Sequence, residues 1–220
     1  MFTGFLEESI LKRAQENELI HIRLIDFREF STSKHKKVDD YPFGGGAGMV
    51  LQVQPVYDAL HSIEGYEKAL KIIVSPQGKP FVQKDAYELS KIEHIIILCG
   101  HYEGYDERIR SYFDLELSIG DYVLTGGELA AMVLVDAITR VIPDVIGKDE
   151  SHLNDSFSND LLEHPHYTRP REFDGKDVPE VLLNGHHEQI KQWRLQKAIE
   201  KTKERRMDLY DAYLKENSHK

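Results

Sequence analysis

Two glycine-containing loops, each preceded by a short apolar run, constrain the fold of this chain most strongly. The first loop, 99–108 (CGHYEGYDER), follows the isoleucine-rich run 94–99 (HIIILC), which is too short for a helix that stands alone. Such a run is typical of a buried strand in a parallel sheet. The second loop is 118–128 (SIGDYVLTGGE). Because open α/β sheets bind ligands where their strands end, the two loops predict one pocket for a small molecule.

Strand and helix patterns alternate along the rest of the amino-terminal part. Apolar residues recur at helical spacing over 2–16, alternate with polar ones over 20–27, and form a strand-like run over 71–74. Helices are expected from Pro55 to about Ile63 and over 85–90. This order indicates an α/β fold with a mainly parallel sheet.

The segment 129–142 has almost no polar face, and Pro143 is expected to end this helix. A helix that is apolar all round must be covered on all sides. In a domain of this size a second subunit is a reasonable source of that cover, so we expect a homodimer.

Composition divides the chain into three parts. We expect an α/β domain over 1–150, a flexible and polar interdomain linker over 151–172, and a small all-helical domain over 173–220. The helical domain has a thin apolar stripe that includes Ile190 and Trp193, beside a basic face.

The net charge of −10 argues against broad binding of nucleic acid. Basic residues nevertheless cluster over 34–37, at Arg169 and Arg171, and over 191–206, which permits local contacts with RNA phosphates. A basic helical face is more often only a solvated surface. The single cysteine, Cys99, is interpreted as a buried, inert thiol and excludes a disulfide within the chain. With neither a signal peptide nor an apolar run of membrane length, we expect a cytoplasmic protein without a membrane partner.

Two further patterns were weighed as nucleotide or metal sites. The glycine run 44–48 lacks the Lys-Ser/Thr that follows a P-loop and does not open a helix, which disfavours a nucleotide-hydrolysing enzyme. Four histidines, His164, His166, His186 and His187, fit no compact zinc pattern, so no metal site is predicted. A role for Mg²⁺ is not readable from the sequence.

Six sequence runs, in order over nearly the whole chain, resemble the bacterial tRNA (guanine-N1)-methyltransferases, the TrmD family of the SPOUT superfamily. The runs are 38–49 (VDDYPFGGGAGM), 75–78 (SPQG), 99–108, 118–128, 155–157 (DSF) and 166–170 (HYTRP).

That resemblance implies a SPOUT-type, mainly parallel sheet over 1–150 with a deep trefoil knot, in which S-adenosylmethionine binds in a bent form. It also implies a homodimer whose active site spans the two subunits. It implies transfer of the methyl group to N1 of the guanine immediately 3′ of the tRNA anticodon, with the helical domain over 173–220 binding tRNA. Relative to the family pattern, the chain starts after the usual first strand and its carboxyl end is short. We therefore expect an exposed sheet edge.

The resemblance also implies the site residues. Asp155 is implied as the general base, and Arg140 as the electrostatic partner that stabilises charge on guanine O6. Without the resemblance, a helix cap for Asp155 and a surface ion pair for Arg140 would be preferred. The implied cofactor-binding residues are Ser75, Pro76, Gln77, Gly78, Gly100, Tyr102, Glu103, Gly104, Ser118, Ile119, Gly120, Asp121, Tyr122, Val123, Leu124, Gly126 and Gly127.

Two alternatives remain open. Another knotted RNA methyltransferase would use the same cofactor on a different nucleotide. A non-catalytic RNA-binding protein could keep the pocket, although the presence of both Arg140 and Asp155 argues against it.

Overall fold

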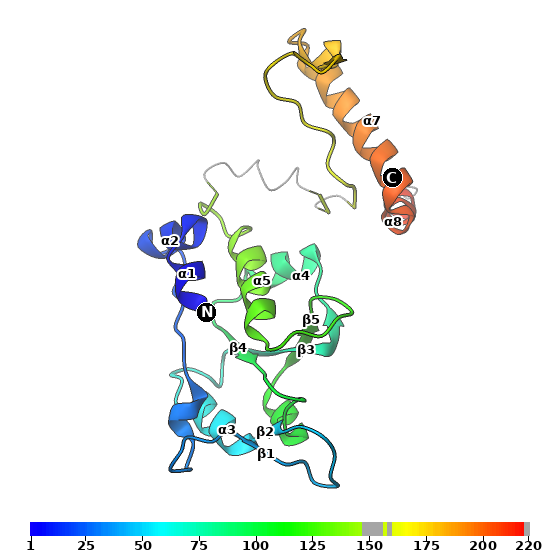
Figure 1. Cartoon of the computed structure of the whole chain (residues 1–220). Helices are drawn as coiled ribbons and strands as arrows, with labels where there is room; N and C mark the ends of the chain where they lie inside the picture. Colours follow the sequence, from blue (N-terminus) through cyan, green and yellow to red (C-terminus); the bar gives the residue numbers. More distant parts are fainter. Residues whose placement is uncertain (147–155, 158–159, 218–220) are drawn as a thin grey trace. The chain divides into compact units, whose positions relative to one another are not determined.

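The computed structural model describes residues 1–146, 156–157 and 160–217. The chain divides into two compact units, which we call unit 1 (Met1–Gly147) and unit 2 (Lys148–Lys220). Figure 1 shows both units, coloured along the sequence.

A three-stranded parallel sheet forms the centre of unit 1. The long strand β3 (Leu70–Pro80) lies between β4 (Ile95–Cys99) and β5 (Leu115–Ser118), and both neighbours run parallel to it. Two short antiparallel strands, β1 (Asp39–Asp40) and β2 (Val50–Leu51), lie apart from this sheet. The expected α/β fold with a mainly parallel sheet is confirmed.

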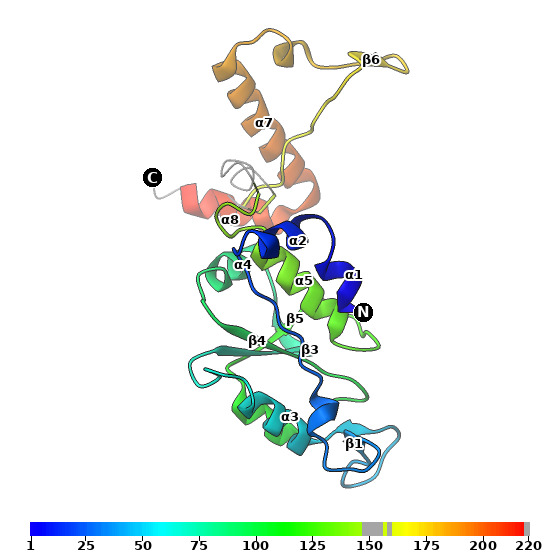
Figure 2. The ribbon, with the colours of Figure 1, turned by 90° about the vertical axis from the view of Figure 1, so that its left-hand side faces the viewer.

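Helices cover both faces of the sheet (Figures 1 and 2). Ile72 and Val74 of β3 pack with helices α4 (Gln83–Leu89) and α5 (Glu128–Thr139). Ile73, between them in sequence, packs instead with α3 (Val53–His61) and the 3-10 helix η2 (Glu107–Tyr112). Because successive side chains of a strand point to opposite faces, one apolar run supplies both layers of the core.

The amino-terminal segment differs from the prediction in two places. The expected helix over 2–16 is broken into α1 (Phe2–Leu6) and α2 (Ser9–Glu16), and Ser9 has a φ of +52°. The expected strand over 20–27 is wrong, because this segment forms no ladder before the 3-10 helix η1 (Phe27–Phe30). Alternating apolar residues specify an extended chain, but a strand also needs a partner for its backbone groups.

The apolar helix α5 ends at Thr139, three residues before the expected end. Its Leu134 is fully buried, whereas Leu129 and Val133 are 48% and 47% exposed. Within the described residues of unit 1, one stripe of this helix therefore stays uncovered.

Unit 2 contains helices α7 (His187–Arg205) and α8 (Met207–Asn217), the 3-10 helix η3 (Glu180–Leu182), and one small hairpin. The hairpin pairs β6 (Glu172–Phe173) with β7 (Lys176–Asp177), so the expectation of an all-helical region is wrong here. The turn residues Asp174 and Gly175 both have positive φ, as a tight two-residue hairpin requires. Across both units, no described helix combines the length and apolarity needed to cross a membrane.

Candidate functional site

Three of the predicted cofactor-binding segments lie in or directly after neighbouring strands, toward the carboxyl ends of these strands: 75–78 within β3, 100–104 after β4 and 119–127 after β5. Residues 75–78 interrupt the pairing of β3 with β5, since the register shifts between Val74 and Lys79. Residues 100–104 follow the last residue of β4, and residues 119–127 follow the last residue of β5. Because the strands are adjacent and parallel, these segments begin at one edge, which is where open α/β sheets bind ligands.

Gly127 holds the ends of two strands together. Its backbone N–H donates a hydrogen bond to the carbonyl oxygen of Gly100 over 2.8 Å. A Cβ atom at Gly127 would lie 2.8 Å from Cα of Cys99 and 2.9 Å from a side-chain carbon of Val74. Only a residue without a side chain fits this position. Gly78 is equally restricted, since a Cβ there would lie 2.5 Å from the backbone nitrogen of Leu117.

Other glycines of the predicted loops face open space instead. A Cβ atom at Gly100 or Gly104 would meet no atom within 4 Å. Gly100 also has no positive φ, so its own backbone does not demand glycine. A ligand can approach the backbone closely at such a position, because neither a side chain nor a neighbouring atom is in the way.

The segment after β5 is organised by local hydrogen bonds and exposes its tip. The buried hydroxyl of Ser118 donates to the carbonyl oxygen of Gly120 over 3.1 Å and accepts from the Gly120 N–H over 3.2 Å. The Tyr122 hydroxyl donates to the carbonyl oxygen of Ile119 over 3.2 Å. Tyr122 and Val123 are 54% and 84% exposed. The tip of this turn therefore faces solvent, while local hydrogen bonds hold its backbone.

The loop after β4 packs against the glycine run 44–48. The Glu103 N–H donates to the Met49 carbonyl oxygen, and the Leu51 N–H donates to the Gly104 carbonyl oxygen, both over 3.0 Å. A Cβ atom at Gly48 would overlap the side chain of Glu103. The glycine run 44–48 therefore adjoins the predicted cofactor loop.

Tyr102 is exposed within this loop. It has a φ of +68°, and its hydroxyl accepts a hydrogen bond from the Arg28 guanidinium over 3.1 Å. A contact between residues 74 positions apart in the chain could not be read from the sequence.

One pair of site residues was missed by the sequence analysis. The His101 imidazole and the Glu128 carboxylate lie 2.5 Å apart, which ties the loop after β4 to the first residue of α5. Gly126 makes room for this pair, since a Cβ there would lie 2.5 Å from both side chains. The available signal was an acidic residue directly after two glycines, at the first turn of a helix.

A cavity of about 1460 Å³ runs along the outer edge of β4. It is lined by the extended segment before η1, by β4, and by one side of α5. Within the described residues β4 pairs only with β3, so its other edge has no strand partner. His101, Tyr102 and Glu128 line the end of the cavity, whereas the segment 119–127 lies outside it.

Of the two implied catalytic residues, the structure describes only Arg140. Arg140 is half-buried and caps the carboxyl end of α5, where its N–H donates to the Asp136 carbonyl oxygen over 3.0 Å. Asp155 lies outside the described residues.

Cys99 is half-buried rather than fully buried, but its surroundings still keep the thiol protonated. Burial, helped by the nearby Glu128 carboxylate, raises the pKa of Cys99 to about 12, so the thiol stays protonated at neutral pH. Among the described residues, no group of three or more His, Cys, Asp or Glu side chains is placed to hold a metal ion.

Comparison with known proteins identifies the family. The family model described as "tRNA (Guanine-1)-methyltransferase TrmD" matches residues 1–212. Proteins named tRNA (guanine-N(1)-)-methyltransferase from Shouchella clausii and Geobacillus kaustophilus are 54% and 56% identical to this chain over 215 residues. Each match covers 97% of this chain and 88% of the relative. The chain therefore belongs to the tRNA (guanine-1)-methyltransferase TrmD family.

Proposed function

We propose that this protein transfers a methyl group from S-adenosylmethionine to N1 of the guanine immediately 3′ of the anticodon in tRNA. Family membership supports the reaction, and the three loops at one sheet edge support the place of the donor. The observation that carries the proposal is the Gly127–Gly100 hydrogen bond, which holds two of these loops together.

The residues at the sheet edge fit S-adenosylmethionine. This cofactor supplies an electrophilic methyl group on a positively charged sulfur. We assign the adenine and ribose contacts to backbone groups of Ile119, Gly120, Tyr122 and Leu124, in the turn that follows β5. The open space at Gly100 is suited to close approach of the folded ligand. The neutral thiol of Cys99 brings no competing nucleophile to this edge.

The target base needs a proton acceptor and a positive charge. Guanine N1 carries a proton at neutral pH, and its nitrogen can bond to the methyl carbon only as that proton leaves. In this proposal the Asp155 carboxylate accepts the N1 proton, the new N–C bond forms, and the electrons of the broken C–S bond stay on sulfur as a neutral thioether. The Arg140 guanidinium donates hydrogen bonds to O6, where negative charge develops.

An aspartate near its reference pKa of about 3.9 is a weak base for this proton. We propose that bound tRNA partly removes water from the Asp155 carboxylate, which raises its basicity. A rate profile against pH that Asp155→Glu leaves unchanged would count against this role.

The remaining features implied by the family complete the proposal. They are a homodimer that covers the exposed stripe of α5 at Leu129 and Val133, a deep trefoil knot of the SPOUT type in the 1–150 domain, and tRNA binding by the 173–220 domain. Since tRNA is the substrate, the enzyme would act in the cytoplasm. A molar mass in solution equal to that of one chain, and not two, would contradict the proposed dimer.

Methyl transfer to an unmodified tRNA transcript tests the function. We expect one methyl group per tRNA, at N1 of the guanine 3′ of the anticodon, and no transfer when that guanine is replaced by adenine. Asp155→Asn should lower the rate by about 100-fold or more. Methylation of a different nucleotide would favour another knotted methyltransferase. Binding of tRNA without any transfer would favour the non-catalytic RNA-binding protein.

A further inference from the structure

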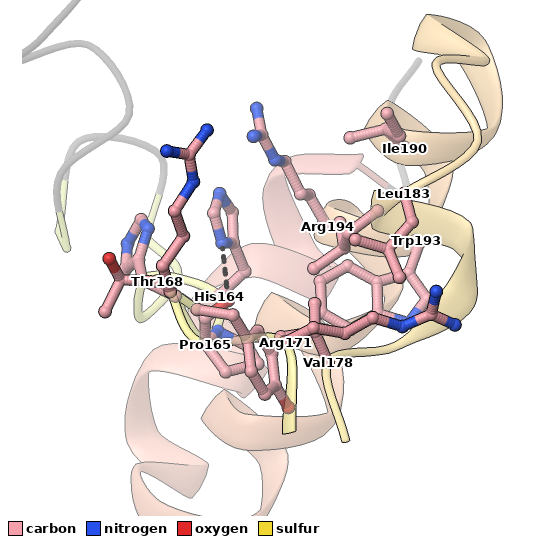
Figure 3. A pocket seen from close by; sticks show the side chains of 13 residues that line it. His164, Pro165, Thr168, Arg171, Val178, Leu183, Ile190, Trp193 and Arg194 are labelled. Atoms are coloured by element: carbon pink, nitrogen blue, oxygen red, sulfur yellow. Dashed lines mark hydrogen bonds between the residues drawn. The ribbon is translucent and has the colours of Figure 1, made fainter. Parts of the chain in front are cut away.

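Unit 2 contains a cavity of its own, of about 550 Å³. Its walls come from the segment 164–171, from the end of the hairpin and η3, and from the amino-terminal half of α7 (Figure 3). A volume of this size lies within the range of pockets that hold small molecules or single nucleotides.

Aromatic rings form one side of this cavity. Trp193 is half-buried, and its ring centroid lies 6.3 Å from that of Tyr167 at an interplanar angle of 53°. Val178, Leu183 and Ile190 lie beside the indole and extend the apolar surface (Figure 3). An indole that is held by apolar neighbours and open on one side can stack against a flat ring.

Three arginines supply the charge. Arg169, Arg171 and Arg194 line the cavity, and all three are exposed. Figure 3 shows the Arg194 side chain standing between the histidine side of the cavity and the indole. Within the described part of the chain, no ion pair engages any of the three guanidinium groups, and no carboxylate lines the cavity.

The two histidines of the cavity do not add to this charge in the same way. The pKa of His164 is lowered by burial and by the neighbouring positive groups His166 and Arg194, so its imidazole is neutral near pH 7. His166 lies 2.7 Å from the Glu163 carboxylate. The unpaired positive charge therefore belongs to the arginines.

We propose that this cavity binds one unstacked nucleotide of a single-stranded RNA loop, with the base against Trp193 and the adjoining phosphates on Arg169, Arg171 and Arg194. Guanidinium groups bind phosphate oxygens through paired hydrogen bonds, and aromatic side chains bind the faces of bases that are free of a helix. The choice of RNA rests on the proposed function. The combination of a flat aromatic wall with a cationic rim favours a nucleotide over an acidic peptide, which offers no flat ring.

The fluorescence of Trp193 measures this binding directly, because it is the only tryptophan of the chain. A single-stranded RNA oligonucleotide should quench it in a saturable way, and more weakly as salt rises. Arg194→Gln should weaken binding at least fivefold. The control is Arg13→Gln in α2, which makes the same charge change at an exposed arginine outside the cavity and outside the basic clusters, and should weaken binding less than twofold.

Substitutions of Trp193 test whether the base stacks on its indole. Trp193→Phe keeps an aromatic face and should retain most of the affinity, measured by filter binding. Trp193→Ala should lose about fivefold or more. If Trp193→Ala does not fold, the Trp193→Phe and Arg194→Gln results still decide the matter. The proposal would be overturned if RNA does not quench the fluorescence, or if an acidic peptide quenches it and RNA does not. It would also be overturned if a blunt RNA duplex binds equally well, or if both arginine variants lose the same affinity.

Methyl transfer separates this inference from the proposed function. Arg194→Gln should raise the KM for tRNA and leave the rate at saturating tRNA and the affinity for S-adenosylmethionine unchanged. If the wild-type protein methylates tRNA while Arg194→Gln and Arg13→Gln have the same KM, the nucleotide site is refuted and the function stands. If RNA quenches Trp193 but no methyl group is transferred, the site stands and the function fails.

Discussion

The backbone N–H of Gly127 donates to the carbonyl oxygen of Gly100 over 2.8 Å, and this bond joins the loop after β5 to the end of β4. A methyl group at residue 127 would come within 3 Å of backbone atoms of Cys99 and Gly100 and of a side-chain carbon of Val74. Gly127→Ala should therefore lower the free energy of unfolding by about 1 to 3 kcal/mol, measured by chemical denaturation. Gly4→Ala in α1, where a Cβ meets no atom within 4 Å, is the matched control and should be neutral or slightly stabilising. Equal stability of the two variants would contradict this packing.

The His101–Glu128 pair predicts an energetic coupling between the loop after β4 and α5. The two groups lie 2.5 Å apart and their side chains are 40% and 22% exposed. A double-mutant cycle with His101→Ala and Glu128→Gln should give a coupling of about 0.5 to 1 kcal/mol in unfolding free energy. Strictly additive effects of the two substitutions would show that the contact has no energetic role.

Cys99 predicts a dependence of stability on alkaline pH. Burial raises its pKa to about 12 in the folded chain, whereas the unfolded thiol titrates near its ordinary value of 9.0. The unfolded chain therefore loses this proton first, and stability should fall as pH rises from about 9 toward 12. The fall should be steeper in the wild type than in Cys99→Ala. At pH 8 a thiol reagent should react slowly with folded protein and rapidly in denaturant. Fast labelling of the folded chain would refute the burial.

The hydrogen bond between Thr202 and Leu162 predicts that Thr202 stabilises unit 2. This residue is fully buried, its hydroxyl donates to the Ala198 carbonyl oxygen over 2.7 Å, and it accepts from the Leu162 N–H over 2.8 Å. Thr202→Val keeps the shape but leaves that N–H without its partner, which should cost about 1 to 3 kcal/mol of stability. Thr202→Ser keeps the hydroxyl and should be milder. A valine variant as stable as the serine variant would show that the hydrogen bond contributes little.

The sheet was predictable because its residues are buried on both faces. The isoleucines of β4 pack against the core on both faces of the sheet. The apolar run also ends at the residue where the strand ends. The segment over 20–27 carries an equally good alternation but forms no ladder, because pairing depends on a partner that a local pattern does not reveal. The hairpin at Asp174 and Gly175 had a local signal, Asp-Gly, that was outweighed by the helical pattern beyond it.

The site was predictable only as far as the loops themselves. Their glycines mark strand ends, but the sequence does not distinguish Gly127, which packing demands, from Gly100, which faces open space. The contacts of His101 with Glu128 and of Arg28 with Tyr102 join distant segments and depend on the folded backbone.

Calorimetric titration of S-adenosylmethionine into Gly100→Ala and Gly4→Ala tests the central claim most directly. At Gly100 a Cβ meets no protein atom within 4 Å, so this variant should be as stable as the wild type. If the cofactor lies against this backbone, Gly100→Ala should bind it at least tenfold more weakly, while Gly4→Ala binds it as the wild type does. Wild-type affinity in a folded Gly100→Ala protein would contradict the placement of the cofactor at this edge of the sheet.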